Sequence, residues 1–258
     1  FQRKFIPARL TDNPYLMASG EYEAMLLSLP EVERRRLLDG DWDVAEGAAF
    51  AEFNRPTHVC EPFELPRGWP RFRTADYGYS SPSCILWGAV DHDGNLWIYR
   101  ELYSKRLTAD ALADAIFEAE AYDPPMYASV LDKSCWNRVA GAPSVAQTMI
   151  QRGIRWLPSN SDRMSGKLEL HKRLQLNEDS GEPHLKIFST CTNLVRTLPT
   201  IPLSRTNSED VDTKSEDHAY DALRYLCMLR QINNTNFSSW SNRIKDTAPE
   251  PRDIVFGY

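Results

Sequence analysis

Residues 215–226 read SEDHAYDALRYL and combine acidic and imidazole groups with an apolar helical repeat. Ser215 is a candidate N-terminal cap, since serine oxygens accept hydrogen bonds from the first free amides of a helix. Apolar positions recur at steps of three and four, which predicts a helix with one buried face. These positions are Ala219, Ala222, Leu223, Leu226 and Leu229.

The polar side of this predicted helix gathers Asp217, His218 and Asp221. Residues three and four apart are neighbours on a helix, so Asp221 lies beside both other side chains. An acidic first turn is favoured by the helix dipole and can be fully solvated. The same carboxylates can also hold a cation between this helix and another element. The helix alone leaves both interpretations open.

Composition excludes several classes of protein. The chain has 258 residues, of which 42% are hydrophobic, enough for a globular domain with a core. Its five cysteines form no C-x-x-C pair, so neither a zinc site nor a disulfide framework is indicated, and a reducing, cytosolic setting fits best. The net charge of −6 argues against general attraction to nucleic acid but allows a local basic groove.

The beginning of the chain and the lack of long apolar runs guide the expected setting. The chain starts at Phe1 without an initiator methionine, and no run of about 18 apolar residues occurs. We expect a soluble fragment of a longer chain, without a membrane segment. Residues 1–66 are rich in Pro, Glu and Arg and contain short amphipathic helical patches at 22–29 and 31–38. They are typical of a helical linker, which Trp42 would dock onto the body.

Three β-type runs follow at 72–78, 84–90 and 96–103. The second and third are joined by residues 91–95, whose Asp-Gly pair is a strong hairpin signal. The sequence therefore predicts a three-stranded antiparallel meander. Asp76 stands where its first strand ends, either as a simple turn-former or as a carboxylate presented at the sheet edge.

A crossover to a further strand comes next. A helix from Thr108 to about Ala119 leads into the apolar run 126–131, which ends at Asp132. A meander followed by a helix and a new strand predicts an α/β sheet with a parallel portion. Ligands gather at strand ends in such sheets, so two strands that both end in aspartate favour a shared site.

The remaining elements include a basic segment. We expect helices at 144–151 and 191–198 and strands at 154–157 and 184–188. Between them, a loop and helix carry four basic side chains, which form either a solvated helix face or a contact for a polyanion. These side chains are Arg163, Lys167, Lys172 and Arg173.

The predicted chemistry rests on carboxylates from three separate elements, namely Asp76, Asp132 and the turn that holds Asp217 and Asp221. Hard oxygen ligands of this kind suit Mg²⁺ or Mn²⁺. Two such ions about 3.5–4 Å apart can activate water and stabilise the leaving oxygen of a phosphodiester. The sequence contains no G-x-S-x-G, G-x-x-x-x-G-K-[ST] or G-x-G-x-x-G motif, so no nucleophilic serine or nucleotide-binding loop is indicated.

The two strand acids, together with HAYDALRY at 218–225 and the acidic run 209–213, resemble the nuclease domain of tailed-bacteriophage terminase large subunits. Residues 6–10 and 38–42 resemble the segment that joins this nuclease to a preceding packaging ATPase. The resemblance implies a linker at 1–66, a ribonuclease H-like domain at 67–232 and a C-terminal tail at 233–258. The expected fold class is α/β, with a mixed sheet of an antiparallel meander and parallel strands flanked by helices.

The resemblance also implies metal-dependent cutting of double-stranded DNA concatemers during genome packaging, with little sequence specificity. Asp76, Asp132 and Asp221 would then bind two divalent ions, Mg²⁺ or Mn²⁺, with His218 beside them as a further catalytic residue. Arg163 and Lys167 become candidate DNA contacts. The implied partners are double-stranded DNA, the ATPase domain of the same chain, the small terminase subunit and the portal protein, in the host cytoplasm.

Three alternatives share parts of this pattern. A Holliday-junction resolvase or transposase-like nuclease would use the same fold and acids. A binding module with lost chemistry would keep the fold and bind no divalent ion. A structural adaptor would contact DNA or the portal without cutting.

Overall fold

The computed structural model describes residues 13–17, 20–27, 34, 37, 47–138, 141–178, 180–204, 207 and 209–229. The segments 6–10 and 38–42, with Trp42, and the tail at 233–258 lie outside these residues. Within the described N-terminal part, two short helices form, α1 at Pro14–Met17 and α2 at Glu21–Leu27. No helix in the described residues is long and apolar enough to cross a membrane.

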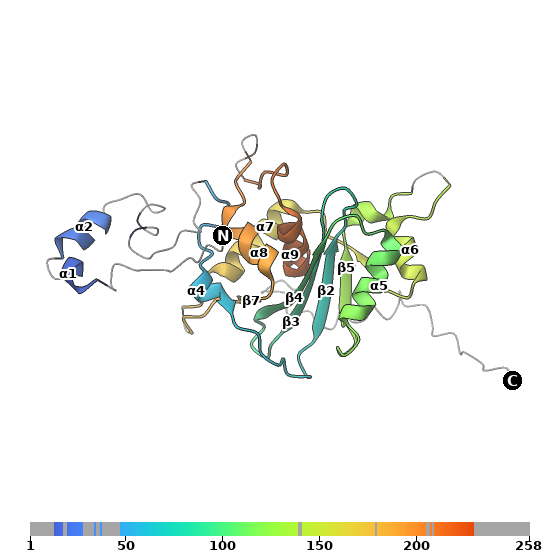
Figure 1. The fold of residues 1–258 in the computed structure, drawn as a ribbon, viewed down its shortest axis with the longest axis horizontal. Coiled ribbons are helices and arrows are strands. Elements are labelled where there is room, and N and C mark those ends of the chain that lie inside the picture. Colours follow the sequence, from blue (N-terminus) through green and yellow to red (C-terminus); the bar gives the residue numbers. More distant parts are fainter. Residues whose placement is uncertain are drawn as a thin grey trace, which may run out of the picture.

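The described body is built on a mixed sheet of seven strands in the order β1-β7-β4-β3-β2-β5-β6 (Figure 1). The pairs β2–β3 and β3–β4 are antiparallel, and the other neighbours are parallel. This confirms the predicted meander with a parallel portion. The strands are β1 Val59–Cys60, β2 Arg71–Asp76, β3 Ser83–Val90, β4 Leu96–Ser104, β5 Ala128–Leu131, β6 Leu157–Pro158 and β7 Leu185–Phe188.

Helices cover both faces of the sheet (Figure 1). One face carries α5 at Ala109–Ala119 and α6 at Val145–Gln151, and the other carries α7 at Arg163–Leu174, α8 at Thr192–Thr197 and α9 at His218–Leu229. Each face has its own buried apolar cluster. The shorter described helices are α4 Arg55–His58, η2 Lys133–Trp136 and η3 Leu198–Thr200.

The β3–β4 hairpin forms where the sequence predicts it. Every residue of β3 is buried, since helices pack on both of its faces. In the turn, Asp91 Oδ1 accepts hydrogen bonds from the backbone amides of Asp93 and Asn95 at 3.0 and 2.8 Å. Gly94 has a φ of +84°, which favours glycine. Local turn chemistry therefore sets the register of the meander.

Helix α9 packs closely on β2 and β3. A Cβ atom at Gly88 of β3 would lie 2.6 Å from Leu226 Cδ2, so glycine lets the helix approach the sheet. The Thr74 hydroxyl of β2 donates a buried hydrogen bond of 2.8 Å to the carbonyl of Ala222. These contacts fix the helix against the strand that ends in Asp76.

The start of α9 differs from the expected cap at Ser215. The helix begins at His218, and the Asp221 amide donates to the Asp217 carbonyl at 2.8 Å, so Asp217 precedes the first turn. The Ser215 hydroxyl instead donates to the carbonyl of Asp212 at 2.5 Å. The prediction of a Ser215 cap is therefore wrong, because this serine stabilises the preceding turn.

Two further details depart from the sequence pattern. Residues 154–157 were expected to form a strand, but only Leu157–Pro158 pairs with β5, while Ile154 and Trp156 pack into the core under α5 and α6. Residues 47–60, which precede the expected nuclease boundary at 67, add β1 to the sheet beside β7 and bury Phe50 and Phe53.

Candidate active site

Two of the predicted acids lie at the same edge of the sheet. Asp76 is the last residue of β2, and Asp132 directly follows β5. These strands are parallel neighbours, with Ala75 opposite Leu131, and the Asp132 amide donates to the Ala75 carbonyl at 3.0 Å. The topology therefore places both acids where parallel strands end, as the sequence predicts.

Asp76 meets His218, the first residue of α9. The His218 Nδ1 atom lies 2.9 Å from Asp76 Oδ2. Burial raises the pKa of Asp76, the hydrogen bond with His218 opposes that rise, and the charges of Asp221 and Asp132 add to it. The same hydrogen bond raises the pKa of His218. The charges of Asp132 and Asp221 thus both act on Asp76.

The carboxylate of Asp132 accepts hydrogen bonds from the short helix that follows it. Its Oδ1 accepts from the Ser134 amide at 3.2 Å, and its Oδ2 accepts from the Ser134 hydroxyl at 2.6 Å. Asp132 therefore caps η2.

Asp221, in the first turn of α9, is held by two guanidinium groups. Arg163 Nη1 lies 3.1 Å from both carboxylate oxygens, and Arg224 Nε lies 3.0 Å from Oδ1. Asp221 is 9% exposed and Arg224 is 2% exposed, so these ion pairs are shielded from solvent.

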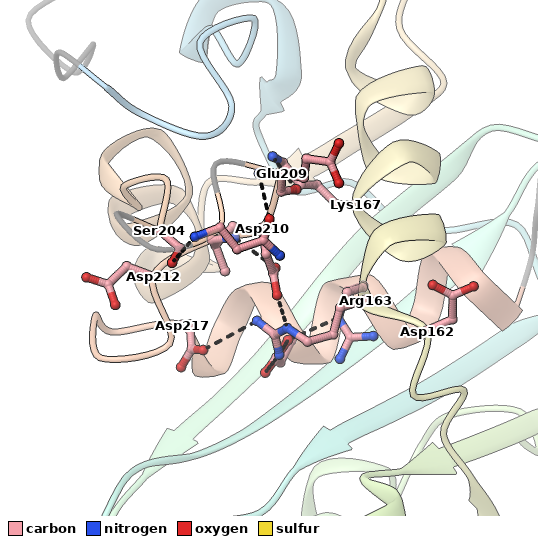
Figure 2. A network of polar contacts seen from close by, with 12 residues as sticks. Asp162, Arg163, Lys167, Ser204, Glu209, Asp210, Asp212 and Asp217 are labelled. Atoms are coloured by element: carbon pink, nitrogen blue, oxygen red, sulfur yellow. Dashed lines mark hydrogen bonds and ion pairs between the residues drawn. The ribbon is translucent and has the colours of Figure 1, made fainter.

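Arg163 reaches Asp221 from the first residue of α7 and binds two more carboxylates (Figure 2). Its Nε donates to Asp210 Oδ2 at 2.8 Å, and its Nη2 lies 3.8 Å from Asp217 Oδ2. Burial raises the pKa of Asp217 to about 7, and the nearby charge of Asp221 adds to this rise. Although burial opposes it, the charge of Asp221 raises the pKa of Arg163.

A close helix crossing makes the Arg163 contacts possible. A Cβ atom at Gly166 of α7 would lie 2.5 Å from Arg224 Cγ on α9. Since Gly166 is three residues after Arg163, and Arg224 is three residues after Asp221, the two pairs lie on matching faces of their helices. The glycine therefore brings α7 near enough for Arg163 to bind Asp221.

Lys167, the other candidate DNA contact, also points into the protein. It is 8% exposed, and its Nζ donates to the Glu209 carbonyl at 2.9 Å (Figure 2). Burial lowers its pKa. Arg163 and Lys167 thus bind residues 209–221 of their own chain, and their contact with DNA stays a prediction. Sequence reasoning missed Asp210 as the Arg163 partner, although the acidic run 209–213 signals it.

The donor chemistry of Asp76, Asp132 and Asp221 suits a hard divalent ion, but their present arrangement does not form a site. Within the described residues, no group of three or more His, Cys, Asp or Glu side chains is placed to hold a metal ion. Each carboxylate instead binds a donor of the protein. The metal-ligand role of these residues therefore stays a prediction.

Comparisons with known proteins relate this fold to solved structures. No protein-family model and no curated protein sequence matches the chain. The nuclease domain of the bacteriophage P22 large terminase superposes with a TM-score of 0.58 and 20% identity, covering 72% of this chain and 94% of that domain. A full-length large terminase of a thermophilic bacteriophage gives a TM-score of 0.58 and 19% identity, covering 80% of this chain and 51% of that protein.

A third solved structure, the large terminase nuclease of the thermophilic phage G20c with bound cobalt, has a TM-score of 0.51 and 13% identity and covers 71% of this chain and 98% of that one. This chain spans about half the length of the full-length large terminases that it matches. At these identities the likeness establishes the fold. The chain has the ribonuclease H-like fold of large terminase nuclease domains.

Proposed function

We propose that this chain is an endonuclease that cuts double-stranded DNA concatemers during viral genome packaging. The observation that carries the proposal is the convergence of Asp76 and Asp132 at neighbouring strand ends of a nuclease fold, where the charges of Asp132 and Asp221 both act on Asp76. Clustered carboxylates of which one has a raised pKa, as Asp76 has, are typical of functional sites. No base-specific pocket is needed for backbone hydrolysis, so we expect little sequence specificity.

Catalysis would depend on two divalent ions, Mg²⁺ or Mn²⁺, held by Asp76, Asp132 and Asp221. When bound, the ions supply an activated water and stabilise the charge on the leaving oxygen. The nuclease of phage G20c was crystallised with cobalt, which supports a divalent ion at the corresponding fold. Carboxylate oxygens are hard ligands, which Mg²⁺ and Mn²⁺ prefer.

The neighbouring side chains of this protein would orient the acids. The His218 hydrogen bond fixes the Asp76 carboxylate at the end of β2. The Arg224 Nε bond to Oδ1 fixes one oxygen of Asp221. Such supporting contacts keep a carboxylate in one rotamer, which preserves the geometry that hydrolysis requires.

DNA contacts would come from exposed basic residues at the same sheet edge. Lys105 and Arg106 follow β4, while Lys133 and Arg138 follow β5, and all four are exposed. Within the described part of the chain, their side chains make no hydrogen bond or ion pair. The ends of β4 and β5 flank those of β3 and β2 and are about 14 Å apart, at about 4.8 Å per strand, so the two basic pairs stand on either side of Asp76.

The backbone at Arg106 supports this placement. Its φ of +63° is in the left-handed region, and its amide donates to the Tyr79 carbonyl at 3.0 Å. A residue other than glycine in this conformation is strained, and such strain concentrates at functional sites. Tyr79 is itself 53% exposed, which adds an aromatic surface next to the basic side chains.

The partners follow from the same proposal. The chain would act beside the ATPase domain of its own full-length protein, with the small terminase subunit and the portal, in the host cytoplasm. The matched region covers 51% of the large terminase of the thermophilic bacteriophage, so about half of that protein is left for such a domain.

The test is incubation of supercoiled plasmid with the protein in Mn²⁺, Mg²⁺ or EDTA. We expect nicking and linearisation with either ion and none in EDTA, and loss of cutting in Asp76→Asn and Asp132→Asn. Asp93→Asn makes the same change in the exposed hairpin at the opposite end of the strands and should cut like the parent. Undiminished cutting in EDTA, or by both site variants, would refute the proposal.

A further inference from the structure

The Arg163 guanidinium occupies the carboxylate to which the proposed function assigns an ion. We propose that Arg163 and a divalent ion compete for Asp221, so that an ion binds only when the guanidinium leaves. The inference rests on the proposed function, because it takes Asp221 as an ion ligand. It explains why two acids lie near enough to act on Asp76 and yet the described residues hold no arrangement ready for a metal.

The first argument is that two guanidinium groups already occupy the Asp221 carboxylate. Arg163 Nη1 contacts both oxygens of Asp221 at 3.1 Å, and Arg224 takes a further position on Oδ1 at 3.0 Å. An ion such as Mg²⁺ binds an oxygen at about 2.0–2.1 Å. An ion on the same carboxylate would therefore stand within a few ångströms of the Arg163 charge, and like charges at that distance repel.

The second argument identifies Arg163, not Arg224, as the group that moves. Arg224 is on the same helix as Asp221, is 2% exposed and lies 4.6 Å over the Tyr225 ring. It is also covered by Gly166 of α7. Arg163 comes from a different helix, at its first residue, and its side chain is 26% exposed. Arg163 is therefore the more exposed of the two guanidinium groups, and its withdrawal should cost less packing than that of Arg224.

The third argument is that Arg163 has a second carboxylate partner besides Asp221. Arg163 Nε donates to Asp210 at 2.8 Å, and this bond involves neither oxygen of Asp221 (Figure 2). Asp217 lies 3.8 Å from Nη2, close enough for an ion pair. The guanidinium can therefore withdraw from Asp221 while Asp210 still balances its charge. This lowers the cost of exchange between the guanidinium and the ion.

If Arg163 only oriented Asp221, its removal would change the ion affinity in the opposite direction. If the guanidinium positioned Asp221 for the ion, its removal would weaken ion binding. If it competes, its removal strengthens binding. Direct measurement of Mn²⁺ binding without DNA separates the two roles and does not depend on catalysis.

The experiment is calorimetric titration of Mn²⁺ into the parent, Arg163→Gln, Lys167→Gln and Asp221→Asn. We expect Arg163→Gln to bind Mn²⁺ about tenfold more tightly than the parent, which corresponds to about 1.4 kcal/mol. Lys167→Gln removes the same charge one helical turn away without a contact to Asp221 and should change the affinity by less than about twofold. This control separates contact from general electrostatics.

Two outcomes overturn the inference alone. If Asp221→Asn loses Mn²⁺ affinity but Arg163→Gln binds equally or more weakly than the parent, the ion uses Asp221 and Arg163 does not compete. Equal gains in Arg163→Gln and Lys167→Gln would reduce the effect to net charge. If Asp221→Asn binds Mn²⁺ like the parent, the proposed ion site itself fails.

A second variant covers the case in which Arg163→Gln fails to fold. Arg163→Lys keeps the charge but lacks the planar fork of donors. It should bind Mn²⁺ a few-fold more tightly than the parent, and an unchanged or lower affinity would again overturn the competition.

Discussion

The Nδ1 atom of His218 lies 2.9 Å from Oδ2 of Asp76, although 142 residues separate them. This contact joins the last described helix to the strand at the centre of the proposed site. Asp76 is half-buried at the end of β2, and the imidazole offsets part of the cost of keeping its carboxylate charged. His218 is therefore placed to orient Asp76 rather than to replace it.

From this contact we expect His218→Gln to slow plasmid cutting by about 10- to 100-fold, as is typical for residues that orient a ligand. Asp76→Asn should cost more, since it removes the carboxylate itself. Initial rates of nicking at saturating Mn²⁺ measure both effects. His92→Gln, in the exposed hairpin turn, is the matched control and should cut at the parental rate. A His218→Gln rate within twofold of the parent would contradict the orienting role.

A second prediction concerns pH and Glu216, which precedes α9. Arg196 binds both Glu216 oxygens at 2.7 and 2.8 Å, and Tyr103 donates to Oε1 at 2.8 Å. The Arg196 hydrogen bonds lower the pKa of Glu216 to about 2. Because the folded pKa is below the unfolded value, the stabilisation is complete above about pH 5 and is lost as pH falls toward 2.

Thermal melts in EDTA should therefore show Glu216→Gln below the parent at pH 6, with a deficit of about 0.5–1 kcal/mol in unfolding free energy because the pair is partly exposed. The deficit should shrink as pH falls below about 4 and be mostly gone at pH 2. Arg196→Gln combined with Glu216→Gln should add little further loss, since the pair is already broken. A deficit that stays constant from pH 6 to pH 2 would show that the ion pair is not its cause.

Much of the fold could be predicted from local patterns. The β3–β4 hairpin follows from Asp91 and Gly94, and α9 follows from the apolar spacing after Ala219. Asp76 and Asp132 fall together because they end neighbouring parallel strands. These features depend on periodicity and on topology rules, both of which a single sequence contains.

Contacts between residues far apart in the sequence could not be predicted from such local patterns. Strand β1 has two residues, too few for a period, and it forms only because β7 offers a parallel edge. Arg163 stands in a basic run that is typical of a solvated face, yet the glycine at 166 brings it onto Asp221. The partner of a charge depends on how two helices cross, and the sequence of one helix does not contain that information.

The inward position of Arg163 changes what is expected of DNA binding. In EDTA, where no cutting occurs, a variant with Lys105, Arg106, Lys133 and Arg138 changed to Gln should bind duplex DNA more weakly for every sequence. Its plot of log affinity against log salt should flatten by about three to four units, since each lost phosphate contact removes about 0.9. Filter binding at several salt concentrations measures the slope.

The comparison variant, Arg163→Gln with Lys167→Gln, should change the slope by less than about one unit, because both side chains bind their own chain. Arg67→Gln, an exposed change before β2 at the far edge of the sheet, controls for net charge. A larger effect of the Arg163 and Lys167 changes than of the four exposed ones would restore these two residues as the main DNA contacts.

The last prediction concerns Asp221 in the absence of metal. Three clustered aspartates suggest that Asp221→Asn should relieve repulsion and raise the melting temperature in EDTA. The structure predicts a lower melting temperature instead, because Asp221 is the shared partner of Arg163 and of Arg224, which is 2% exposed. Loss of its charge leaves a buried guanidinium without its anion, at a cost of about 1.5–3 kcal/mol. Thermal melts in EDTA should therefore place Asp221→Asn below the parent.

Asp132→Asn is the matched control for that measurement. Asp132 contacts Ser134 and no basic side chain among the described residues, and asparagine caps a helix about as well as aspartate. Its melting temperature in EDTA should therefore stay near that of the parent. If Asp221→Asn melts at or above the parent while Asp132→Asn does not change, repulsion among the acids outweighs the two arginine pairs. Arg163 would then hold Asp221 too weakly to compete with an ion.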